Sequence, residues 1–314
     1  NRPSCGMMFP VRTGRHLFCK TVYTRGGGVP KTAPDEIERS VVKKFKKSIW
    51  YRFMGGIIDY RLIGAGDRIA VCVSGGKDSM LMAKCVQHLQ KYSKYPFEAE
   101  YIAMDPGYAP QDRQLIADNA ERLGIPLRIF DTAIFRVVEK AGKSPCYLCA
   151  RMRRGHLYRQ AQSLGCNKIA LGHHFDDVIE TILMSLLYGA EIRTMMPKLR
   201  STNFPGMELI RPMYLVREAD IVSWQRYNGL NFLQGACRVS AAQGEGGCGG
   251  SKRSEIKALI ASFRKTNPYI DINIFKSVHN VSLETIIGYR RGNERRSFLD
   301  SYDDPDGAHT GEER

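Results

Sequence analysis

The stretch Val71-Cys72-Val73-Ser74-Gly75-Gly76-Lys77-Asp78-Ser79-Met80 decides the fold of this chain, because an apolar, β-branched run ends there at a polar, glycine-containing turn. Residues 69–73 are typical of a buried strand in a parallel sheet. After the turn, apolar residues recur at helical spacing, as Leu81, Met82, Cys85, Val86 and Leu89. The stretch therefore predicts a strand, a turn and the N-terminus of a helix.

The turn has the composition of a phosphate-binding loop. Gly75 and Gly76 allow backbone N–H groups to approach an anion closely, the helix dipole favours negative charge, and Lys77 adds a positive charge. The common P-loop is excluded, because it needs a glycine five residues before Gly76 and none stands there. We therefore predict a nucleotide site of another kind over residues 74–79, with an ordinary glycine-rich turn as the alternative.

The hexapeptide Ser-Gly-Gly-Lys-Asp-Ser after a strand resembles the signature of the ATP pyrophosphatase (PP-loop) superfamily. Members of that superfamily cleave ATP to AMP and pyrophosphate and adenylate a carbonyl oxygen. The resemblance implies that the phosphates of ATP bind to Ser74, Gly75, Gly76, Lys77, Asp78 and Ser79. We expect Lys77 to neutralise charge as pyrophosphate leaves, and we count Asp78 beside it as catalytic.

The chain is strongly basic. Among its 314 residues are 47 Lys and Arg against 32 Asp and Glu, which gives a formal charge of +15. A nucleotide pocket needs only a few positive groups, so this excess favours an extended anionic partner such as nucleic acid, with a generally basic soluble surface as the alternative. No run approaches the ~18 apolar residues of a membrane span, and no hydrophobic signal region stands near the start. We expect a cytoplasmic protein with no membrane partner.

Strand and helix patterns alternate through the middle of the chain. Further strands are expected over 97–104, 127–130, 168–171 and 209–211, and helices over 111–123, 133–140, 147–164, 176–188 and 218–228. This alternation predicts an α/β fold with a doubly wound parallel sheet, whose ligand lies at the carboxyl ends of the strands. We divide the chain into a basic N-terminal extension (1–40), a PP-loop domain (41–240), and a glycine-rich insertion with a C-terminal helical and tail region (241–314).

A basic amphipathic helix is predicted from Pro34 onward. Its charged face carries Lys43, Lys44, Lys46 and Lys47, and its apolar face carries Ile49, Phe53, Ile57 and Ile58. Such a helix can lie on RNA, or it can be a lid that packs on the sheet and leaves its lysines in solvent. The sequence supports the two interpretations equally.

The nine cysteines indicate a reducing compartment with metal or redox roles for some of them, because a chain of this length does not need disulfide bonds to be stable. Cys72, Cys85 and Cys166 fall on positions expected in the core. Cys5 and Cys19 lie in the basic extension, where either a metal site with two further ligands or a mobile arm without metal fits the sequence.

Cys146 and Cys149 stand at C-x-x-C spacing at the start of a predicted helix. Two such thiolates can share one metal or cluster, and the helix N-terminus and the arginines that follow would lower their pKa values. A redox dithiol is the competing interpretation, but that motif is expected near the start of a small βαβ domain. A metal or cluster site needs a further thiol, and composition does not choose between Cys237 and Cys248.

The segment Gly172-His173-His174-Phe175-Asp176-Asp177 again leads from a predicted strand into a helix. Carboxylates at this edge, facing the phosphate loop, could hold Mg²⁺ or orient the activated substrate, since Mg²⁺ usually binds one or two carboxylates together with substrate phosphates. Asp176 is the first choice. In the alternative, Asp176 only caps the helix and Asp177 only interacts with its dipole. The histidines also fit a hydrolytic dimetal site, which the phosphate loop makes unnecessary.

Five motifs in this order resemble the tRNA 2-thiocytidine synthetases (TtcA type). They are S-G-G-K-D-S, P-C-x-L-C-x-R-x-R-R-G, A-L-G-H-H-x-D-D-x-x-E-T, M-x-P-K-L and I-R-P-x-x-x-V-R-E-x-D, within residues 45–240. The resemblance implies a [4Fe-4S] cluster held by Cys146, Cys149 and Cys237, ATP with Mg²⁺, and thiolation of a tRNA pyrimidine at C2. It also implies a homodimer.

The chain departs from that family after the third thiol. The family usually has C-x-x-C-G-S there, whereas this chain reads Cys237-Arg238-Val239-Ser240. The tract 244–250, which contains Cys248, resembles an insertion. The ATPase and cluster predictions hold despite these departures. The identity of the base that is modified is left open.

We therefore predict an ATP-dependent tRNA sulfurtransferase that adenylates C2 of a tRNA pyrimidine, first of all cytidine, and inserts sulfur with the help of the cluster. Adenine would lie near Ala103 and Asp105, His173 would contact the cofactor, and Asp176 would hold the metal or the base. The sulfur donor would be a cysteine desulfurase or sulfide. The alternatives are a related enzyme that thiolates another base or acceptor, an amide-forming or lysidine-forming PP-loop enzyme, and a zinc-stabilised RNA-binding module regulated by nucleotide.

Overall fold

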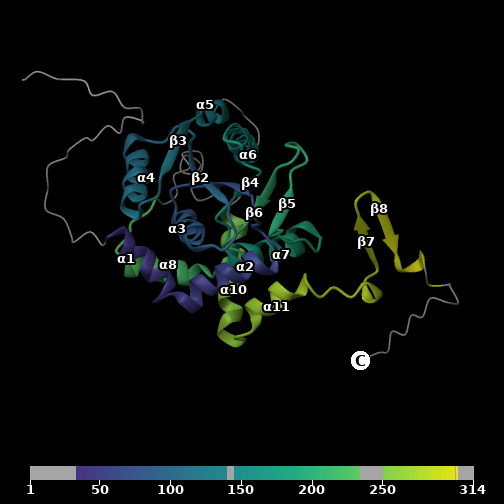
Figure 1. Cartoon of the computed structure of the whole chain (residues 1–314). Helices are drawn as coiled ribbons and strands as arrows, with labels where there is room; N and C mark the ends of the chain where they lie inside the picture. Colours follow the sequence, from purple (N-terminus) through teal and green to yellow (C-terminus); the bar gives the residue numbers. More distant parts are fainter. Residues whose placement is uncertain (1–32, 140–144, 234–249, 301, 303–314) are drawn as a thin grey trace, which may run out of the picture. The chain divides into compact units, whose positions relative to one another are not determined.

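A computed structural model of the chain describes residues 33–139, 145–233, 250–300 and 302. Its main element is a six-stranded sheet with the order β3-β2-β1-β4-β6-β5 (Figure 1). The strands are β1 (Arg68–Cys72), β2 (Glu98–Asp105), β3 (Leu127–Asp131), β4 (Lys168–Ala170), β5 (Lys198–Arg200) and β6 (Glu208–Ile210). All neighbours pair in parallel except β5, which runs antiparallel to β6. The predicted doubly wound α/β fold is confirmed, and the antiparallel edge strand is an addition to it.

The strand order places a ligand site beside β1. This strand pairs with β2 on one side and with β4 on the other, so the direction in which the chain adds strands reverses there. Loops that leave neighbouring strands at such a reversal diverge to opposite faces of the sheet and leave a crevice at the carboxyl edge. The phosphate loop after β1 and the His173-His174 segment after β4 therefore open toward the same crevice.

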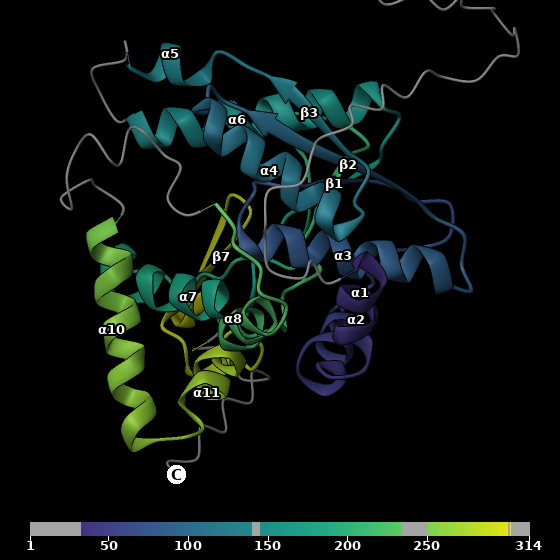
Figure 2. The ribbon, with the colours of Figure 1, turned by 90° about the vertical axis from the view of Figure 1, so that its left-hand side faces the viewer.

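Alternate residues of β1 pack on opposite faces of the sheet. Ile69 and Val71 belong to a large core cluster with residues of α1 (Pro34–Val42), α3 (Lys77–Tyr92), α4 (Pro110–Leu123) and α8 (Glu218–Tyr227). Ala70 and Cys72 belong to a second cluster, with residues of α6 (Pro145–Ser163). Helices therefore cover both faces, as the doubly wound topology requires (Figure 1 and Figure 2).

The predicted N-terminal helix is built in three segments, α1, a π-helical turn over Lys46–Trp50, and α2 (Tyr51–Asp59). Ile37 and Phe53 are fully buried in the main core. The core therefore includes α1, which begins within the stretch 1–40. The apolar face thus packs as the lid interpretation expects, although Ile58 is 65% exposed. The lysine face, Lys43, Lys44, Lys46 and Lys47, is exposed.

The C-terminal region forms a helical layer against α7 (Phe175–Gly189). Helix α10 (Gly250–Thr266) and helix α11 (Ile270–Ser277) share a third apolar cluster with α7, to which Ile179, Ile260 and Phe275 contribute. A two-stranded hairpin follows, with β7 (Gly288–Arg291) and β8 (Glu294–Ser297). Helix α5 (Ile134–Glu139) and the 3₁₀ turns Leu283–Thr285 and Phe298–Asp300 complete the elements of the described residues. Within the described ranges, no helix is long and apolar enough to cross a membrane.

Gly172 lies where the loop after β4 packs against the start of α3. A Cβ atom at this position would lie 3.0 Å from both the backbone N and the Cα of Ser79, in the first turn of α3. Those neighbours are backbone atoms, so the strain cannot be relieved by turning a side chain. The glycine therefore allows the start of α7 to approach the start of α3.

We predict that Gly172→Ala lowers the free energy of unfolding by about 1–3 kcal/mol, because the added Cβ atom is forced against the backbone of Ser79. The measurement is urea denaturation followed by circular dichroism. Gly189→Ala is the matched control, since nothing in the described structure lies within 4 Å of its added Cβ. Equal destabilisation by the two substitutions would contradict the close approach as the cause.

Candidate active site

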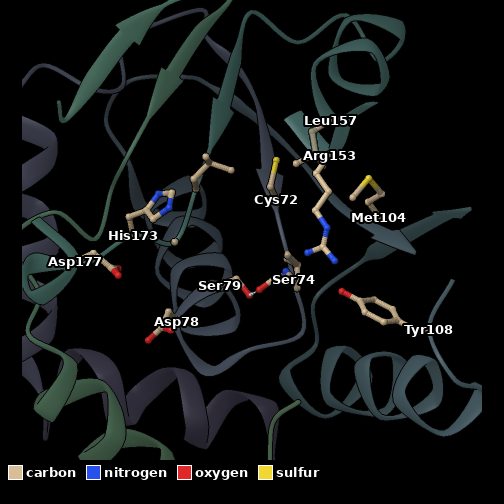
Figure 3. Close-up of a pocket in the computed structure, with 13 residues that line it drawn as sticks. Cys72, Ser74, Asp78, Ser79, Met104, Tyr108, Arg153, Leu157, His173 and Asp177 are labelled. Atoms are coloured by element: carbon tan, nitrogen blue, oxygen red, sulfur yellow. Dashed lines mark hydrogen bonds between the residues drawn. The ribbon is translucent and has the colours of Figure 1, made fainter. Parts of the chain in front are cut away.

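The crevice beside β1 contains a cavity of about 330 Å³. Thirteen residues line it, from the ends of β1, β2 and β4 and from α3, α6 and α7 (Figure 3). They are Cys72, Val73, Ser74, Asp78, Ser79, Met104, Tyr108, Arg153, Leu157, Leu171, Gly172, His173 and Asp177. The two glycine-containing loops of the sequence analysis thus meet at one cavity.

The phosphate loop is held in a fixed shape. Gly75 has a φ of +86°, and a Cβ there would lie 2.6 Å from Cγ1 of Ile116. Ser79 Oγ accepts a hydrogen bond from the Ser74 backbone N at 3.0 Å and lies 3.0 Å from the Gly76 carbonyl oxygen. The loop therefore opens the N-terminus of α3, with its unpaired N–H groups and positive dipole end, beside the cavity.

Lys77 points toward two carboxylates, one of which, Asp78, lines the cavity. Its Nζ lies 3.0 Å from Glu218 Oε1 and 3.1 Å from Asp78 Oδ1. Burial alone would lower the pKa of Lys77, but these two carboxylates raise it, so the ammonium group stays charged. Lys257, from α10, donates to the other oxygen of Glu218 at 3.2 Å. Glu218 is therefore shared between two lysines.

The electrostatics of Glu218 follow from this sharing. Burial would raise the pKa of its carboxyl group, but the hydrogen bond and charge of Lys77, together with the charge of Lys257, lower the pKa to about 2. A carboxylate with a lowered pKa contributes stability that is present above the unfolded-state pKa and is lost as the pH falls toward the folded-state pKa.

The two aspartates at the start of α7 have different surroundings. Asp176 accepts one hydrogen bond from the Glu218 backbone N and one from Arg264 Nη2, each at 2.7 Å. Both of its oxygens are therefore used in contacts with α8 and α10. Asp177 lines the cavity, where it accepts the His174 backbone N at 3.0 Å and Arg253 Nη2 at 3.2 Å. The structure thus brings Asp177 to the cavity and turns Asp176 away from it.

His174 lies between the two carboxylates of the site. It is 4% exposed, with Nδ1 3.5 Å from Asp177 Oδ2 and Nε2 3.8 Å from Asp78 Oδ1. That oxygen of Asp78 is buried and lies 3.1 Å from the Lys77 ammonium group. Asp78 therefore brings to the cavity a carboxylate that is paired with one cation.

His173 contributes a neutral ring to the cavity. Arg211 Nε donates to His173 Nδ1 at 3.3 Å, and because a guanidinium group can only donate, the ring proton is assigned to Nε2. Burial, and then the charge of Arg211, lower the pKa of His173 to about 4. The imidazole is thus a hydrogen-bond donor through Nε2 at neutral pH.

Helix α6 links the C-x-x-C motif to the cavity. Cys149 is 6% exposed in an apolar cluster with Met104, Phe135 and Val138. One helical turn later, Arg153 lines the cavity, and Figure 3 shows its guanidinium group extending toward Ser74 and Tyr108. The Nε atom of Arg153 is buried without a hydrogen-bond partner in the described structure.

The structure describes only some of the predicted cluster ligands. Cys146 is placed by its backbone in the first turn of α6, and Cys237, like its rival Cys248, lies outside the described residues. The same holds for Cys5 and Cys19. Within the ranges that the structure describes, no three His, Cys, Asp or Glu residues gather as a metal site. Cys72, Cys85 and Cys166 are buried, as expected.

The predicted adenine contacts lie on β2. Ala103 is 2% exposed in the main core, whereas its neighbour Met104 lines the cavity. Asp105 accepts hydrogen bonds from the backbone N atoms of Gly107 and Tyr108. Burial would raise the pKa of its carboxyl group, but these hydrogen bonds and Arg113 lower the pKa. Asp105 therefore shapes the loop that brings Tyr108 to the cavity.

Several cavity residues have no clear signal in the sequence. Arg153 stands out there only as one arginine of a basic group, although its position four residues after Cys149 places both on one face of α6. Met104 and Tyr108 carry no signal of their own. The pairing of Glu218 with Lys77 spans 141 residues, so no local pattern could indicate it.

The fold and the phosphate loop together define a PP-loop domain, and residues 52–238 match the model of the PP-loop domain family. Among curated relatives, the tRNA-cytidine(32) 2-sulfurtransferase of Vibrio campbellii is 34% identical over 76% of this chain and 79% of that protein. The tRNA-cytidine(32) 2-sulfurtransferase of Coxiella burnetii is 32% identical over 82% of this chain and 99% of that protein. The chain belongs to the tRNA 2-thiocytidine synthetase (TtcA-type) family, as the five motifs predicted.

A solved structure supports the fold. The U34-tRNA thiolase NcsA from Methanococcus maripaludis, determined with its [4Fe-4S] cluster, covers 82% of this chain and 80% of its own, with a TM-score of 0.56. At 22% sequence identity, that likeness concerns the fold alone. Together with the match of residues 52–238 to the PP-loop domain family, this likeness confirms the predicted PP-loop architecture.

We predict that Glu218→Gln makes stability less sensitive to acid. In the wild-type protein, the contribution of Glu218 is present above pH 4.5, the ordinary value for glutamate, and is lost as the pH falls toward about 2. The neutral amide of the variant cannot show this loss. The free energy of unfolding should therefore fall less steeply between about pH 5 and about pH 3 for the variant than for the wild-type protein. Parallel curves for the two proteins would contradict the assigned ion pairs.

Proposed function

We propose that the protein is an ATP-dependent tRNA sulfurtransferase that adenylates the C2 oxygen of a tRNA pyrimidine, first of all cytidine, and replaces that oxygen with sulfur. The observation that carries the proposal is the single cavity that joins the phosphate loop, two carboxylates and the helix of the C-x-x-C motif. Family membership supports the same assignment, since the curated relatives carry the name tRNA-cytidine(32) 2-sulfurtransferase.

The residues of the phosphate loop fit a triphosphate. Gly75 holds a positive φ against Ile116, where a side chain would collide, and the N-terminus of α3 supplies N–H groups and positive potential. When the phosphates of ATP bind, Lys77 transfers from Glu218 to the phosphates and offsets charge on the departing pyrophosphate. Lys257 stays beside Glu218, so the carboxylate is not left buried without a cation.

The carboxylates of Asp78 and Asp177 fit a magnesium ion that accompanies ATP. Both line the cavity, and carboxylate oxygens are the kind of ligand that Mg²⁺ prefers. Asp78 becomes available to the ion when Lys77, which it now contacts at 3.1 Å, moves to the phosphates. Asp177 takes the place that the sequence analysis gave to Asp176, because Asp177 lines the cavity, whereas Asp176 is not among the lining residues and holds α8 and α10. Asp176 is then a positioning residue, which fixes the backbone at Glu218.

The rest of the cavity lining fits a nucleobase and the negative charge that develops during the reaction. Met104 and Leu157 offer apolar surface, and Tyr108 an aromatic ring. Arg153 carries a buried Nε without a partner in the described residues, and His173 presents its Nε2–H. These donors can hold the α-phosphate and the base oxygen while charge develops between them.

Cys146, Cys149 and the more distant Cys237 would hold the iron-sulfur cluster. The described part of this set fits the group, because Cys149 is buried in an apolar cluster one helical turn from the cavity residue Arg153. A cluster with three cysteine ligands would supply an iron atom without a protein ligand at which sulfur is delivered. The sulfur donor, a cysteine desulfurase or sulfide, and the homodimer are part of the same proposal.

The reaction has two steps. The C2 oxygen of the base attacks the α-phosphorus of ATP, and the bond to pyrophosphate breaks. Sulfur at the oxidation level of sulfide then forms a bond to C2, and AMP leaves with the original base oxygen. Lys77 and Asp78 act in the first step, and the Arg153 guanidinium group stabilises negative charge in both.

The test is mass spectrometry of tRNA nucleosides after anaerobic incubation with ATP, Mg²⁺ and sulfide. We expect wild-type protein to form 2-thiocytidine and Asp177→Asn to lose at least about 100-fold in rate, since a metal contact contributes several kcal/mol. Asp176→Asn should instead lower the melting temperature, because it breaks two structural contacts. No thiolated nucleoside with wild-type protein contradicts the function, and a fully active Asp177→Asn contradicts the metal assignment.

We predict that Cys237→Ala loses both iron and thiolation, whereas Cys248→Ala keeps both. The two substitutions are matched, because they remove the two rival third thiols. The measurements are iron content and visible absorption after anaerobic purification, with about four irons expected per wild-type chain. Iron loss only in Cys248→Ala would reverse the ligand assignment, and a colourless zinc protein would contradict the cluster.

A further inference from the structure

A cluster of arginines lies on the C-terminal hairpin, Gly288–Ser297, which we name the arginine hairpin (Figure 1). Its ten residues carry four arginines and one glutamate, and every residue of its two strands is exposed. Gly292, with a φ of +63°, forms the turn. The hairpin lies beyond residues 52–238, which match the PP-loop domain family, so the function of that domain does not explain it.

The register of the hairpin places like charges opposite each other. Arg290 pairs with Arg295 across the strands, while Tyr289 pairs with Arg296 and Arg291 with Glu294. Cross-strand partners share a face, and like charges in that position are destabilising. A two-stranded hairpin is marginally stable by itself. An opposed arginine pair is thus a cost to this fold that an anionic ligand would offset.

Two of the arginines are available to such a ligand. Arg290 contacts Glu191 at 3.5 Å, and Arg296 contacts Glu294. In the described part of the chain, no carboxylate lies within ion-pair distance of Arg291 or Arg295. Guanidinium groups bind phosphate in a planar, bidentate manner, which lysine cannot do.

Tyr289 favours RNA over other anionic ligands. It is 40% exposed, and it shares a face with Arg291 and Arg296, because alternate residues of a strand and cross-strand partners point the same way. An exposed aromatic ring beside guanidinium groups suits an unpaired base next to its phosphates. A free phosphate or mononucleotide would be held by a concave pocket, whereas this surface is fully open.

The ion pair between Arg290 and Glu191 relates the hairpin to the cavity. Glu191 follows the end of α7, and Asp177, in the first turn of the same helix, lines the cavity. From Asp177 to Gly189 the helix rises about 18 Å at ~1.5 Å per residue. A folded RNA can span that length, so one molecule can contact the hairpin and place a base in the cavity.

We infer that the arginine hairpin is an accessory tRNA-binding element. Arg291 binds a backbone phosphate on the face where Tyr289 stacks on an unpaired base, and Arg295 binds a second phosphate on the opposite face, beside Arg290. The inference rests on the proposed function, because that function makes tRNA the substrate. It assigns part of the affinity for tRNA to a surface outside the catalytic cavity.

The test is the dissociation constant of full-length protein for deacylated tRNA, measured across salt concentrations. Arg291→Gln/Arg295→Gln should weaken binding about 10-fold and reduce the slope of log K against log salt by about 2, because each of the two guanidinium groups neutralises one phosphate. Tyr289→Ala should weaken binding about 5-fold or more, because the base then has no ring to stack on, with the slope unchanged. ATP binding should stay at the wild-type value in both variants, which shows that the fold is intact.

Lys94→Gln/Arg226→Gln is the matched control, because it removes the same charge from exposed side chains elsewhere in the chain. We expect it to bind tRNA within about twofold of wild type. If the hairpin variants bind as tightly as this control, the accessory element is contradicted while the proposed function stands. If wild-type protein binds no tRNA at any salt concentration, both are contradicted.

Discussion

The ion pair between Lys77 and Glu218 is the contact on which the site depends. It joins the first turn of α3 to the first turn of α8, and Asp176 accepts the backbone N of the same Glu218. The N-termini of α3, α7 and α8 are thereby fixed next to one another, and those of α3 and α7 line the cavity. Helix N-termini repel each other through their dipoles, and the carboxylates of Asp78, Asp177 and Glu218 offset that repulsion.

Helix α10 supplies the cations for this arrangement. Arg253 donates to Asp177 and Glu180, Lys257 to Glu218, and Arg264 to Asp176. All three come from one face of a helix that lies beyond the matched PP-loop domain. The C-terminal helices therefore belong to the site, because without them the carboxylates beside the phosphate loop would repel each other and the incoming phosphates.

Local sequence patterns predicted the sheet and the phosphate loop because both depend on short-range signals. The apolar run before Ser74 and the helical spacing after it place the loop without reference to the rest of the chain. The choice between Asp176 and Asp177 could not be made in this way, since it depends on contacts with Arg264 and Glu218 far along the sequence. The antiparallel strand β5 has three residues, which is too short for a periodic pattern.

That short strand limits how the sheet can associate. β5 forms one edge of the six-stranded sheet and carries Lys198 and Arg200, of which Arg200 has a side chain 93% exposed. Short edge strands with basic side chains resist pairing with a strand of another molecule, which is the route to edge-to-edge aggregation. At the β5 edge, the sheet is therefore protected against the addition of a strand from another molecule, even in a crowded cell.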